Sequence, residues 1–326
     1  MPGLKTAVKN LATSSFDKHV SQHLQKIIGS STISLLDVGA ADGADDRWSL
    51  FRRYIDYFGV EPDARSANSV LNTDSKSDYH SESLITRALW HSPGEVTLNL
   101  CRKPMVSSIY EPNRIFLDLF PDAMRNDIVD NVKLLCETVD NIAKESETDF
   151  DVIKLDVQGA ELDVLRGATS ALRTAIAIEI EVEFCEIYNG QPLFDQIFSY
   201  LREHGFEFID FLFIYRWSPD QFNGIGQSTF ADALFMPAPE TISKSRDEDA
   251  IRKYAVVCTI YERGDLLIRL GNAVSRAPSR GAELSSEILS LGKLLSARNA
   301  RTQRQLNRVA KMIRIFHPRF RAHIFH

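Results

Sequence analysis

The sequence lacks any apolar run close to the roughly 20 residues needed to span a bilayer. Its start, MPGLKTAVKN, also lacks the continuous apolar segment of a secretory signal. The four cysteines lie far apart and form no C-x-x-C pair, which argues against a disulfide framework or a thiolate zinc site. With 44% hydrophobic and 25% charged residues, the chain has the composition of an ordinary globular protein, and we expect it in the cytoplasm.

Acidic residues are missing from the last part of the chain. Residues 288–326 contain nine Lys or Arg and no Asp or Glu. Because the whole chain has a net charge of −6, residues 1–287 carry −15. An acidic body with a basic tail disfavours a nucleic-acid partner, since phosphates would be repelled by most of the protein.

Apolar strand-like runs alternate with amphipathic helical runs between about residues 33 and 236. This alternation predicts an α/β fold with a mostly parallel sheet and helices on both faces. Segments 84–90 and 95–100 flank the turn HSPG and suggest a hairpin. We expect a helical segment over 1–30, the α/β domain over 31–240 and a helical, basic extension over 241–326. The expected strands are 33–38, a short second strand that ends in GVEPD (59–63), 150–157, 175–182, 206–215 and 231–237. The expected helices are 47–58, 160–172 and 192–205.

The segment LLDVGAADG, residues 35–43, looks like a buried strand that runs into a tight turn. In open α/β sheets such a turn belongs to the ligand site at the carboxyl ends of the strands. Gly39 and Gly43 allow the backbone to turn tightly and a ligand to approach it closely. Glu61, at the end of the second strand, is placed to accept hydrogen bonds from two ribose hydroxyls. The pattern predicts a ribose-containing cofactor, although small residues can also serve strand-to-helix packing alone.

The turn lacks two of the three glycines that a dinucleotide site needs to hold a pyrophosphate. Ala41 and Ala44 stand in their places, and Asp42, Asp45 and Asp46 would repel a pyrophosphate. S-adenosylmethionine suits this turn better, because it carries a sulfonium and an amino group but no phosphate. A nicotinamide-dependent oxidoreductase or epimerase and a binding module without catalytic activity are the alternatives.

Seven blocks of the sequence resemble, in order, those of FkbM-type S-adenosylmethionine-dependent methyltransferases. The resemblance spans roughly residues 33–237, and the sequence departs from it at Ala41, where many members have Asn. It implies a Rossmann-like fold and methyl transfer, most often to a hydroxyl of a sugar, glycolipid or natural product. The segment ADALFMP, residues 231–237, is compatible with the reversed last strand of such folds. The blocks are DVGAADG, GVEPD, VSSIYEPN, ETVDNI, IKLDVQGAELDVLRGA, EVEFCEIYNGQPLF and GFEFIDF.

Five further residues are candidates for the cofactor pocket. We expect Asp37, Gly39 and Ala40 to shape the part that holds the methionine moiety. Ser107 and Ser108 lie in one of the family-like blocks, so we expect them to line the cofactor or acceptor pocket. The alternative for these two serines is an ordinary polar loop.

Methyl transfer to a hydroxyl requires alignment of the acceptor with the methyl group and removal of a proton. Asp156 ends the fourth strand, at the ligand edge of the sheet, and is our first candidate for a base, a metal ligand or an acceptor-positioning group. Its alternative role is to cap the helix that starts near Ala160. Lys154 lies within the same strand, and pairing with an acid is the simplest account of it.

Three glutamates, Glu179, Glu181 and Glu183, alternate with apolar residues and therefore project from one face of a strand. Burial of all three would be costly, so we expect at least Glu181 and Glu183 to face an opening beside Asp156. Glu181 is the second catalytic candidate, and together with Asp156 it could bind a hard cation such as Mg²⁺. A solvated edge or pairing with Arg and Lys would explain the same acids.

The basic tail carries an apolar stripe at three- and four-residue intervals. As a helix it would suit an anionic membrane surface, so we expect peripheral membrane contact and a lipid-linked or membrane-proximal acceptor. The alternative is a helix that packs its stripe on the catalytic domain or on a second subunit of a homo-oligomer. The stripe residues are Leu306, Val309, Ile313, Phe316 and Phe320.

Overall fold

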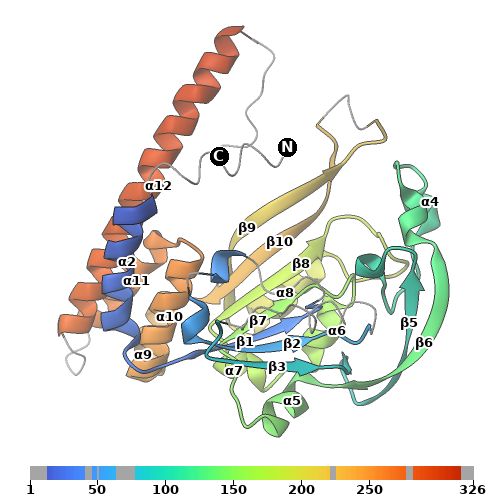
Figure 1. The fold of residues 1–326 in the computed structure, drawn as a ribbon, viewed down its shortest axis with the longest axis horizontal. Helices are drawn as coiled ribbons and strands as arrows, with labels where there is room; N and C mark the ends of the chain where they lie inside the picture. The colour runs from blue at the N-terminus through green and yellow to red at the C-terminus, as the bar shows by residue number, and fades with distance from the viewer. Residues whose placement is uncertain are drawn as a thin grey trace. The chain divides into compact units, whose positions relative to one another are not determined.

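The computed structural model describes residues 13–40, 46–49, 51–63, 78–220, 225–276 and 282–316 of the chain. Contacts between residues divide the chain into two compact units. One is Thr32–Ala238, and the other joins Met1–Ser31 with Pro239–His326. The α/β region therefore forms one unit, and the N-terminal segment belongs with the C-terminal helices (Figure 1).

In the described part of the unit Thr32–Ala238, seven strands form the main sheet (Figure 1). Their order in space is β3-β2-β1-β7-β8-β10-β9. The first five of these run parallel, and β10 runs antiparallel to both β8 and β9. The predicted mostly parallel sheet with a reversed last strand is confirmed. The strands are β1 (Ile33–Val38), β2 (Ile55–Val60), β3 (Ser81–Ile85), β7 (Val152–Leu155), β8 (Ala177–Glu183), β9 (Phe206–Trp217) and β10 (Gln227–Pro237).

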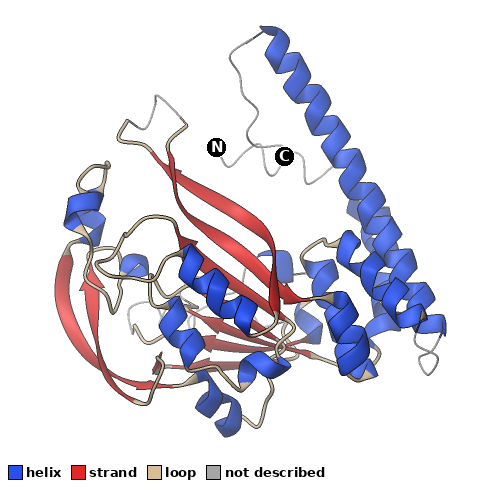
Figure 2. Cartoon of the chain, turned by 180° about the vertical axis from the view of Figure 1, so that it is seen from behind, coloured by secondary structure: helices blue, strands red, loops and turns tan. Residues whose placement is uncertain are grey.

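The central strands are buried along their whole length. Every residue of β1 and of β8 is buried, as expected for parallel strands that are covered on both faces. Helices α6 (Glu161–Arg166) and α8 (Phe194–Glu203) contribute apolar side chains to the same core. Figure 2 shows helices in front of the strands on one face of this sheet.

The order of the strands fixes where a ligand can bind. The chain passes from β1 to β2 on one side, whereas β7 flanks β1 on the other. The carboxyl ends of these three strands therefore meet at the switch point of the sheet. Backbone hydrogen bonds hold them together there, from Gly39 N to Val60 O (2.9 Å) and from Asp156 N to Val38 O (3.0 Å).

Two of the expected helices differ in the structure. The helix predicted over 160–172 is two short helices, α6 and α7 (Ala171–Thr174). Gly167 ends the first of them, and a Cβ there would lie only 2.3 Å from the carbonyl oxygen of Trp90. The helix predicted over 47–58 is wrong. The described residues of this stretch form two 3₁₀ turns, η1 (Asp46–Trp48) and η2 (Arg52–Tyr54), and then enter β2, whose alternating burial fits a strand.

The hairpin predicted from segments 84–90 and 95–100 is also wrong. β5 (Gly94–Cys101) pairs antiparallel with β6 (Ile128–Glu137), and the short β4 (Ala88–Leu89) pairs parallel with the other edge of β6. These strands form a separate three-stranded sheet (Figure 1). The remaining helices of this unit are α4 (Arg114–Leu117) and α5 (Val139–Glu145), with two 3₁₀ turns, η3 (Pro104–Val106) and η4 (Ala123–Asn126).

The helical unit packs closely through small residues. A Cβ on Gly271 would lie 2.6 Å from Cγ of Leu289, so α11 and α12 approach closely at this point. Glu287 on α12 accepts a hydrogen bond from Lys26 on α2 at 2.6 Å. The described helices are α2 (Thr13–Ile28), α9 (Pro239–Ser245), α10 (Glu248–Ile260), α11 (Gly264–Ser275) and α12 (Ala282–Phe316).

The second half of α12 contains part of the predicted stripe. Residues 301–305 are exposed and Leu306 is half-buried. Phe320 lies outside the described residues, and so do the side chains of Val309, Ile313 and Phe316. None of the described helices combines the length and the apolar character needed to cross a membrane.

Candidate active site

A cavity of about 150 Å³ lies where β1, β2 and β7 end. Polar groups from the three strand ends and from the following loops form one part of its wall. Leu89, Leu98 and Leu134 of the smaller sheet contribute apolar surface. The polar part of the wall includes Gly39, Glu61, Ser107, Lys154, Asp156 and Gln158. Four of the residues predicted from the sequence, Gly39, Glu61, Ser107 and Asp156, thus come together at one pocket.

Asp37, at the end of β1, is completely buried and bound by two partners. Its Oδ1 lies 2.8 Å from Nζ of Lys154, and its Oδ2 accepts a hydrogen bond from the Tyr57 hydroxyl at 2.9 Å. Burial disfavours the charged form of Lys154, but the carboxylates of Asp37 and Asp156 outweigh this and raise its pKa. The pairing expected for Lys154 is present. Asp37 does not line the pocket itself, but it holds the side chain of Lys154, which does.

Gly39 turns the backbone directly after β1. Its φ of 87° lies in the left-handed region, and a Cβ there would lie 1.9 Å from the carbonyl oxygen of Asp156. Ala40 is fully buried, and its N–H donates to the carbonyl oxygen of Val60 at 3.1 Å. Both residues therefore shape the turn with their backbone. Gly43, the other predicted glycine, lies outside the described residues.

Glu61 directly follows β2 and lines the pocket while being only 6% exposed. Its Oε1 accepts a hydrogen bond from the N–H of Asp63 at 2.8 Å, which orients the carboxylate. Its own N–H donates to the carbonyl oxygen of Ile85 at 3.0 Å. The side chain lies where a second-strand acid can accept hydrogen bonds from a ribose.

The two predicted serines have different positions. Ser107 lies in the pocket wall, and its Oγ accepts a hydrogen bond from the N–H of Cys101 at 3.0 Å. Ser108 is 1% exposed, and its Oγ donates to the carbonyl oxygen of Gln158 at 2.6 Å. Ser108 thus binds the backbone of the loop after β7 and does not line the pocket.

The side-chain amide of Gln158 bridges the two catalytic candidates. Its Nε2 donates to Oδ1 of Asp156 at 2.7 Å and to Oε1 of Glu181 at 2.9 Å. Its Oε1 lies 3.0 Å from the hydroxyl of Tyr188. Gln158 has a φ of 57°, which is uncommon for a residue other than glycine. From the sequence, Gln158 and Glu161 are weaker candidates for the site, with polar positions in the first turn of the helix as the alternative.

Asp156 does not cap the following helix. The residue that precedes α6 is Ala160, and no side chain caps that end. The carboxylate of Glu161 instead binds the backbone of the loop before α6. Its Oε1 accepts hydrogen bonds from the N–H of Val157 at 2.8 Å and from the N–H of Gly159 at 3.3 Å. The carboxylate of Asp156 is therefore directed to the pocket wall, where Gln158 holds it.

The expectation that Glu181 and Glu183 face an opening is wrong. Glu179, Glu181 and Glu183 are 4%, 8% and 0% exposed, respectively. Glu179 lies 3.6 Å from Arg47, measured from Oε2 to Nη1. β8 is buried on both faces as far as its carboxyl end. The three carboxylates on one of these faces are therefore buried, and Glu181 contacts the loop after β7 through Gln158.

A second cleft, of about 350 Å³, lies between η4 and the connection from β9 to β10. Arg125 stacks on the ring of Trp217, with its guanidinium carbon 4.9 Å from the ring centroid. Arg216 donates to the carbonyl oxygen of Gly226 at 3.5 Å. Within the described residues, neither Arg125 nor Arg216 forms an ion pair with a carboxylate.

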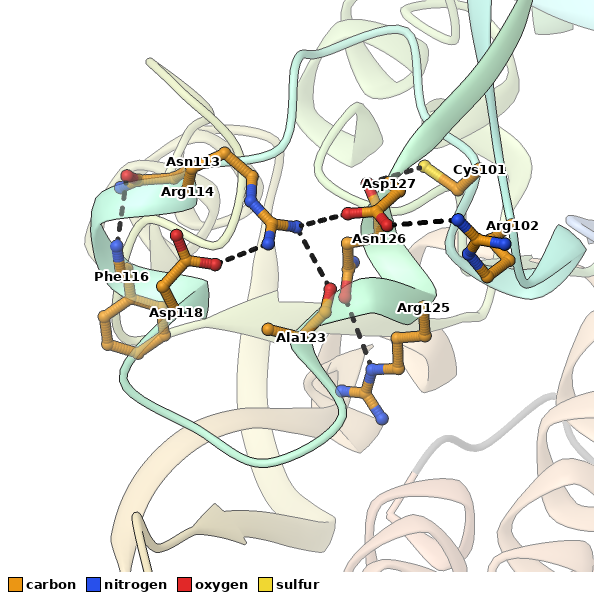
Figure 3. Close-up of polar contacts among 10 residues, drawn as sticks. All are labelled: Cys101, Arg102, Asn113, Arg114, Phe116, Asp118, Ala123, Arg125, Asn126 and Asp127. Atoms are coloured by element: carbon orange, nitrogen blue, oxygen red, sulfur yellow. Dashed lines mark hydrogen bonds and ion pairs between the residues drawn. The ribbon is translucent and has the colours of Figure 1, made fainter.

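Arg114 fixes the turn that carries Arg125 (Figure 3). It donates to the carbonyl oxygen of Ala123 at 3.0 Å and pairs with Asp118 and with Asp127, the latter at 3.2 Å. These contacts give η4 a defined backbone, so the cleft has a fixed wall on this side.

The strand order, the reversed β10 and the pocket at the switch point define a Rossmann-like fold of the methyltransferase type. Residues 37–208, more than half of the chain, match the family model described as the methyltransferase FkbM domain. The chain belongs to the FkbM methyltransferase family, which confirms the resemblance seen in the sequence, and its cofactor is S-adenosylmethionine. No curated protein matches the chain.

Several solved structures overlap weakly with the chain. Sp1610 of Streptococcus pneumoniae has a TM-score of 0.33 and 13% identity, over 87% of this chain and 98% of that one. Precorrin-6y C5,15-methyltransferase of Geobacter metallireducens has a TM-score of 0.35 and 10% identity, over 70% and 91%. TrmK of M. capricolum, bound to S-adenosyl-homocysteine, has a TM-score of 0.30 and 10% identity, over 85% and 96%. Overlaps this weak carry no argument about function, which rests on the family match.

Proposed function

We propose that this protein transfers the methyl group of S-adenosylmethionine to a hydroxyl group. The observation that carries the proposal is the carboxylate of Asp156, which lies in the pocket wall and is oriented by Gln158. The acceptor oxygen attacks the methyl carbon, and the bond from this carbon to sulfur breaks. The electron pair returns to sulfur, which leaves S-adenosylhomocysteine, and Asp156 takes the proton of the hydroxyl.

The cofactor would be held by groups from the three strand ends. Glu61 accepts hydrogen bonds from the ribose hydroxyls, and the Gly39 turn allows the methionine part to approach the backbone closely. The ion pair of Lys154 with Asp37 keeps the region next to the positive sulfonium close to neutral. Glu181 acts on Asp156 through Gln158 and is not placed to touch the cofactor directly.

We propose that the cleft beside Trp217 receives part of the acceptor. Its two arginines, Arg125 and Arg216, favour an acceptor that carries an anionic group. Phosphorylated or carboxylated sugars and lipid-linked glycans have this chemistry. The family resemblance supports the same broad class of sugar, glycolipid and natural-product acceptors.

An acceptor panel with methyl-labelled S-adenosylmethionine tests this function. The panel pairs neutral sugars and polyols with their phosphorylated or carboxylated counterparts, and each labelled product is checked for an O-methyl group. Asp156→Asn should lower turnover by about 10²-fold or more, while cofactor affinity changes little. Asp195→Asn, an exposed acid at the start of α8, is the matched control. Methylation at nitrogen or carbon only would contradict the proposed chemistry.

The two alternatives give different outcomes in the same experiment. Binding of S-adenosylhomocysteine without turnover of any acceptor would favour a catalytically inactive binding module. Binding of NAD in its place would favour the nicotinamide-dependent oxidoreductase, against which the family match already argues.

The basic second half of α12 supports a proposed location for the reaction. We propose that it contacts anionic lipid headgroups and so brings a protein of the cytoplasm to a membrane-proximal acceptor. Each basic residue near the headgroups contributes about 1 kcal/mol to such binding. The competing account is association with a second subunit, which a measurement of mass in solution distinguishes.

A further inference from the structure

Three carboxylates from two elements converge inside the α/β unit. Glu161 begins α6, and Glu181 and Glu183 lie near the carboxyl end of β8. One oxygen of each lies within 4.8 Å of one oxygen of each of the others. The three side chains are almost completely shielded from solvent, because the residues are 1%, 8% and 0% exposed.

The contacts of these carboxylates leave their charge without compensation. Glu161 accepts from two backbone N–H groups and Glu181 from the amide of Gln158. Neither oxygen of Glu183 has a hydrogen-bond partner within the described residues. The amide of Gln191 lies near enough to lower the pKa of Glu183, but the contact does not reach hydrogen-bond geometry, and Nε2 of Gln191 has no partner among the described residues.

No described Lys or Arg forms an ion pair with any of the three glutamates. Asp156 and Asp232 lie close enough to add further negative charge, since both raise the pKa of Glu181 after burial itself. A buried carboxylate without a counter-charge costs several kcal/mol. The cluster therefore has to bind either protons or a cation, and Glu183 has both oxygens available to a ligand.

The chemistry of the donors points to a hard cation. Carboxylate oxygens are the ligands that Mg²⁺, Mn²⁺ and Ca²⁺ prefer, and the cluster contains no nitrogen or sulfur ligand that would favour a softer metal. We propose that Glu161, Glu181 and Glu183 form a binding site for one divalent cation. The amide of Gln191 would then orient the ligating carboxylate of Glu183.

This site differs from the pair Asp156 and Glu181 expected from the sequence. The amide of Gln158 lies between those two carboxylates and donates to both, so it occupies the place of a shared cation. In the proposed site the cation fixes Glu181, and Glu181 fixes Gln158, which holds Asp156. This effect on Asp156 rests on the proposed function, whereas binding of the cation does not.

The protonation of the cluster sets the pH dependence of binding. A carboxylate has to lose its proton to bind a metal ion, so the cation displaces any proton that the three glutamates hold. Binding releases these protons, so affinity for the cation should rise with pH.

Calorimetric titration of the full chain with MnCl₂ tests the proposal, with electron paramagnetic resonance of Mn²⁺ as a second readout. We expect one site whose affinity rises at least about tenfold between about pH 6 and about pH 8. Glu183→Gln should weaken Mn²⁺ binding by at least about tenfold, because it removes the negative charge of one ligand. The variant should fold, because this buried position accepts an uncharged side chain of the same shape. Glu203→Gln, an exposed residue at the end of α8, should bind as the unchanged protein does.

Titration of the same samples with S-adenosylhomocysteine separates the two proposals. A protein that binds S-adenosylhomocysteine but no Mn²⁺ at millimolar concentration and about pH 8 would overturn the cation site and leave the proposed function intact. Unchanged Mn²⁺ affinity in both Glu183→Gln and Glu181→Gln would place the metal elsewhere and also overturn the site. A protein that binds Mn²⁺ but no S-adenosylhomocysteine would contradict the proposed function and leave the cation site intact.

Discussion

Nζ of Lys154, which lines the pocket, lies 2.8 Å from Oδ1 of the fully buried Asp37. The acid in the first family-like block is therefore half of a buried ion pair. Removing one partner of such a pair usually costs about 3–5 kcal/mol. Here the lower end of this range applies, because Asp156 still offsets part of the charge of Lys154. The pair stabilises the ends of β1 and β7 in the arrangement that the pocket requires.

Asp37→Asn should lower the free energy of unfolding by about 3 kcal/mol, because Lys154 then loses its charged partner. Tyr57→Phe, which removes only the hydroxyl bound to Asp37, should cost about 1 kcal/mol. Urea denaturation followed by circular dichroism measures both. Equal stability of Asp37→Asn and the unchanged protein would show that the ion pair does not hold the strand ends.

Gly39→Ala should abolish binding of S-adenosylhomocysteine and destabilise the fold by more than about 2 kcal/mol. The new Cβ would lie 1.9 Å from the carbonyl oxygen of Asp156, so β1 and β7 would have to separate. Gly29→Ala is the matched control, because Gly29 also has a positive φ but no atom within 4 Å of the added Cβ. The control should cost only the strain of the left-handed conformation, about 1 kcal/mol. Similar losses in both variants would contradict the argument from close approach.

The sequence predicts the central strands well, because their burial on both faces requires continuous apolar runs. It fails for β6, where polar residues interrupt the apolar ones without a regular alternation and apolar residues such as Val129 and Leu135 are exposed. β6 is the pairing partner of both β5 and β4, so without it the sequence indicates a hairpin between neighbouring segments. The helix predicted over 47–58 failed because pairing with β1 extends the backbone from Ile55 onward.

The site could be predicted only in part. Glu61 and Asp156 follow strands, so their place at the ligand edge follows from the fold. The bridge made by Gln158 depends on its left-handed backbone and on Tyr188, which follows it by 30 positions. The cluster of Glu161 with Glu181 and Glu183 depends on how α6 begins beside β8. Neither contact leaves a pattern of spacing in the sequence.

The stability of the protein in EDTA should show the titration of Glu161. Burial raises the folded-state pKa to about 8, above its ordinary value in the unfolded chain. This group therefore favours the folded state most below the unfolded pKa, and its contribution is lost as the pH rises through about 8. Glu161→Gln keeps an acceptor oxygen but cannot ionise, so its stability relative to the unchanged protein should increase as the pH rises. A difference that is constant with pH would contradict the raised pKa.

The orienting role of Gln158 predicts a separation of turnover from binding. Gln158→Ala leaves Asp156 without the amide that holds it, so turnover should fall by about tenfold or more. Affinity for S-adenosylhomocysteine should change by less than about threefold, since Glu61 and the Gly39 turn are intact. Initial rates measured beside calorimetric binding decide between these effects. A loss of affinity equal to the loss of turnover would assign Gln158 to cofactor binding.

Membrane contact predicts a dependence on the charge of α12. Arg301→Glu with Arg304→Glu should reduce flotation with anionic vesicles at low salt, because both residues are exposed on the second half of the helix. Lys103→Glu with Lys144→Glu changes the net charge equally at exposed sites of the α/β unit and should leave flotation unchanged. If the unchanged protein stays in the soluble fraction, the membrane proposal is wrong.

Calorimetric titration with S-adenosylhomocysteine tests the central claim most directly. The account predicts binding at one site, weakened by about 1–3 kcal/mol in Glu61→Ala, because the ribose hydroxyls lose their acceptor. Glu82→Ala, an exposed residue of β3, should bind as the unchanged protein does. The account would be contradicted if a folded protein gave neither heat nor a thermal shift at millimolar S-adenosylhomocysteine.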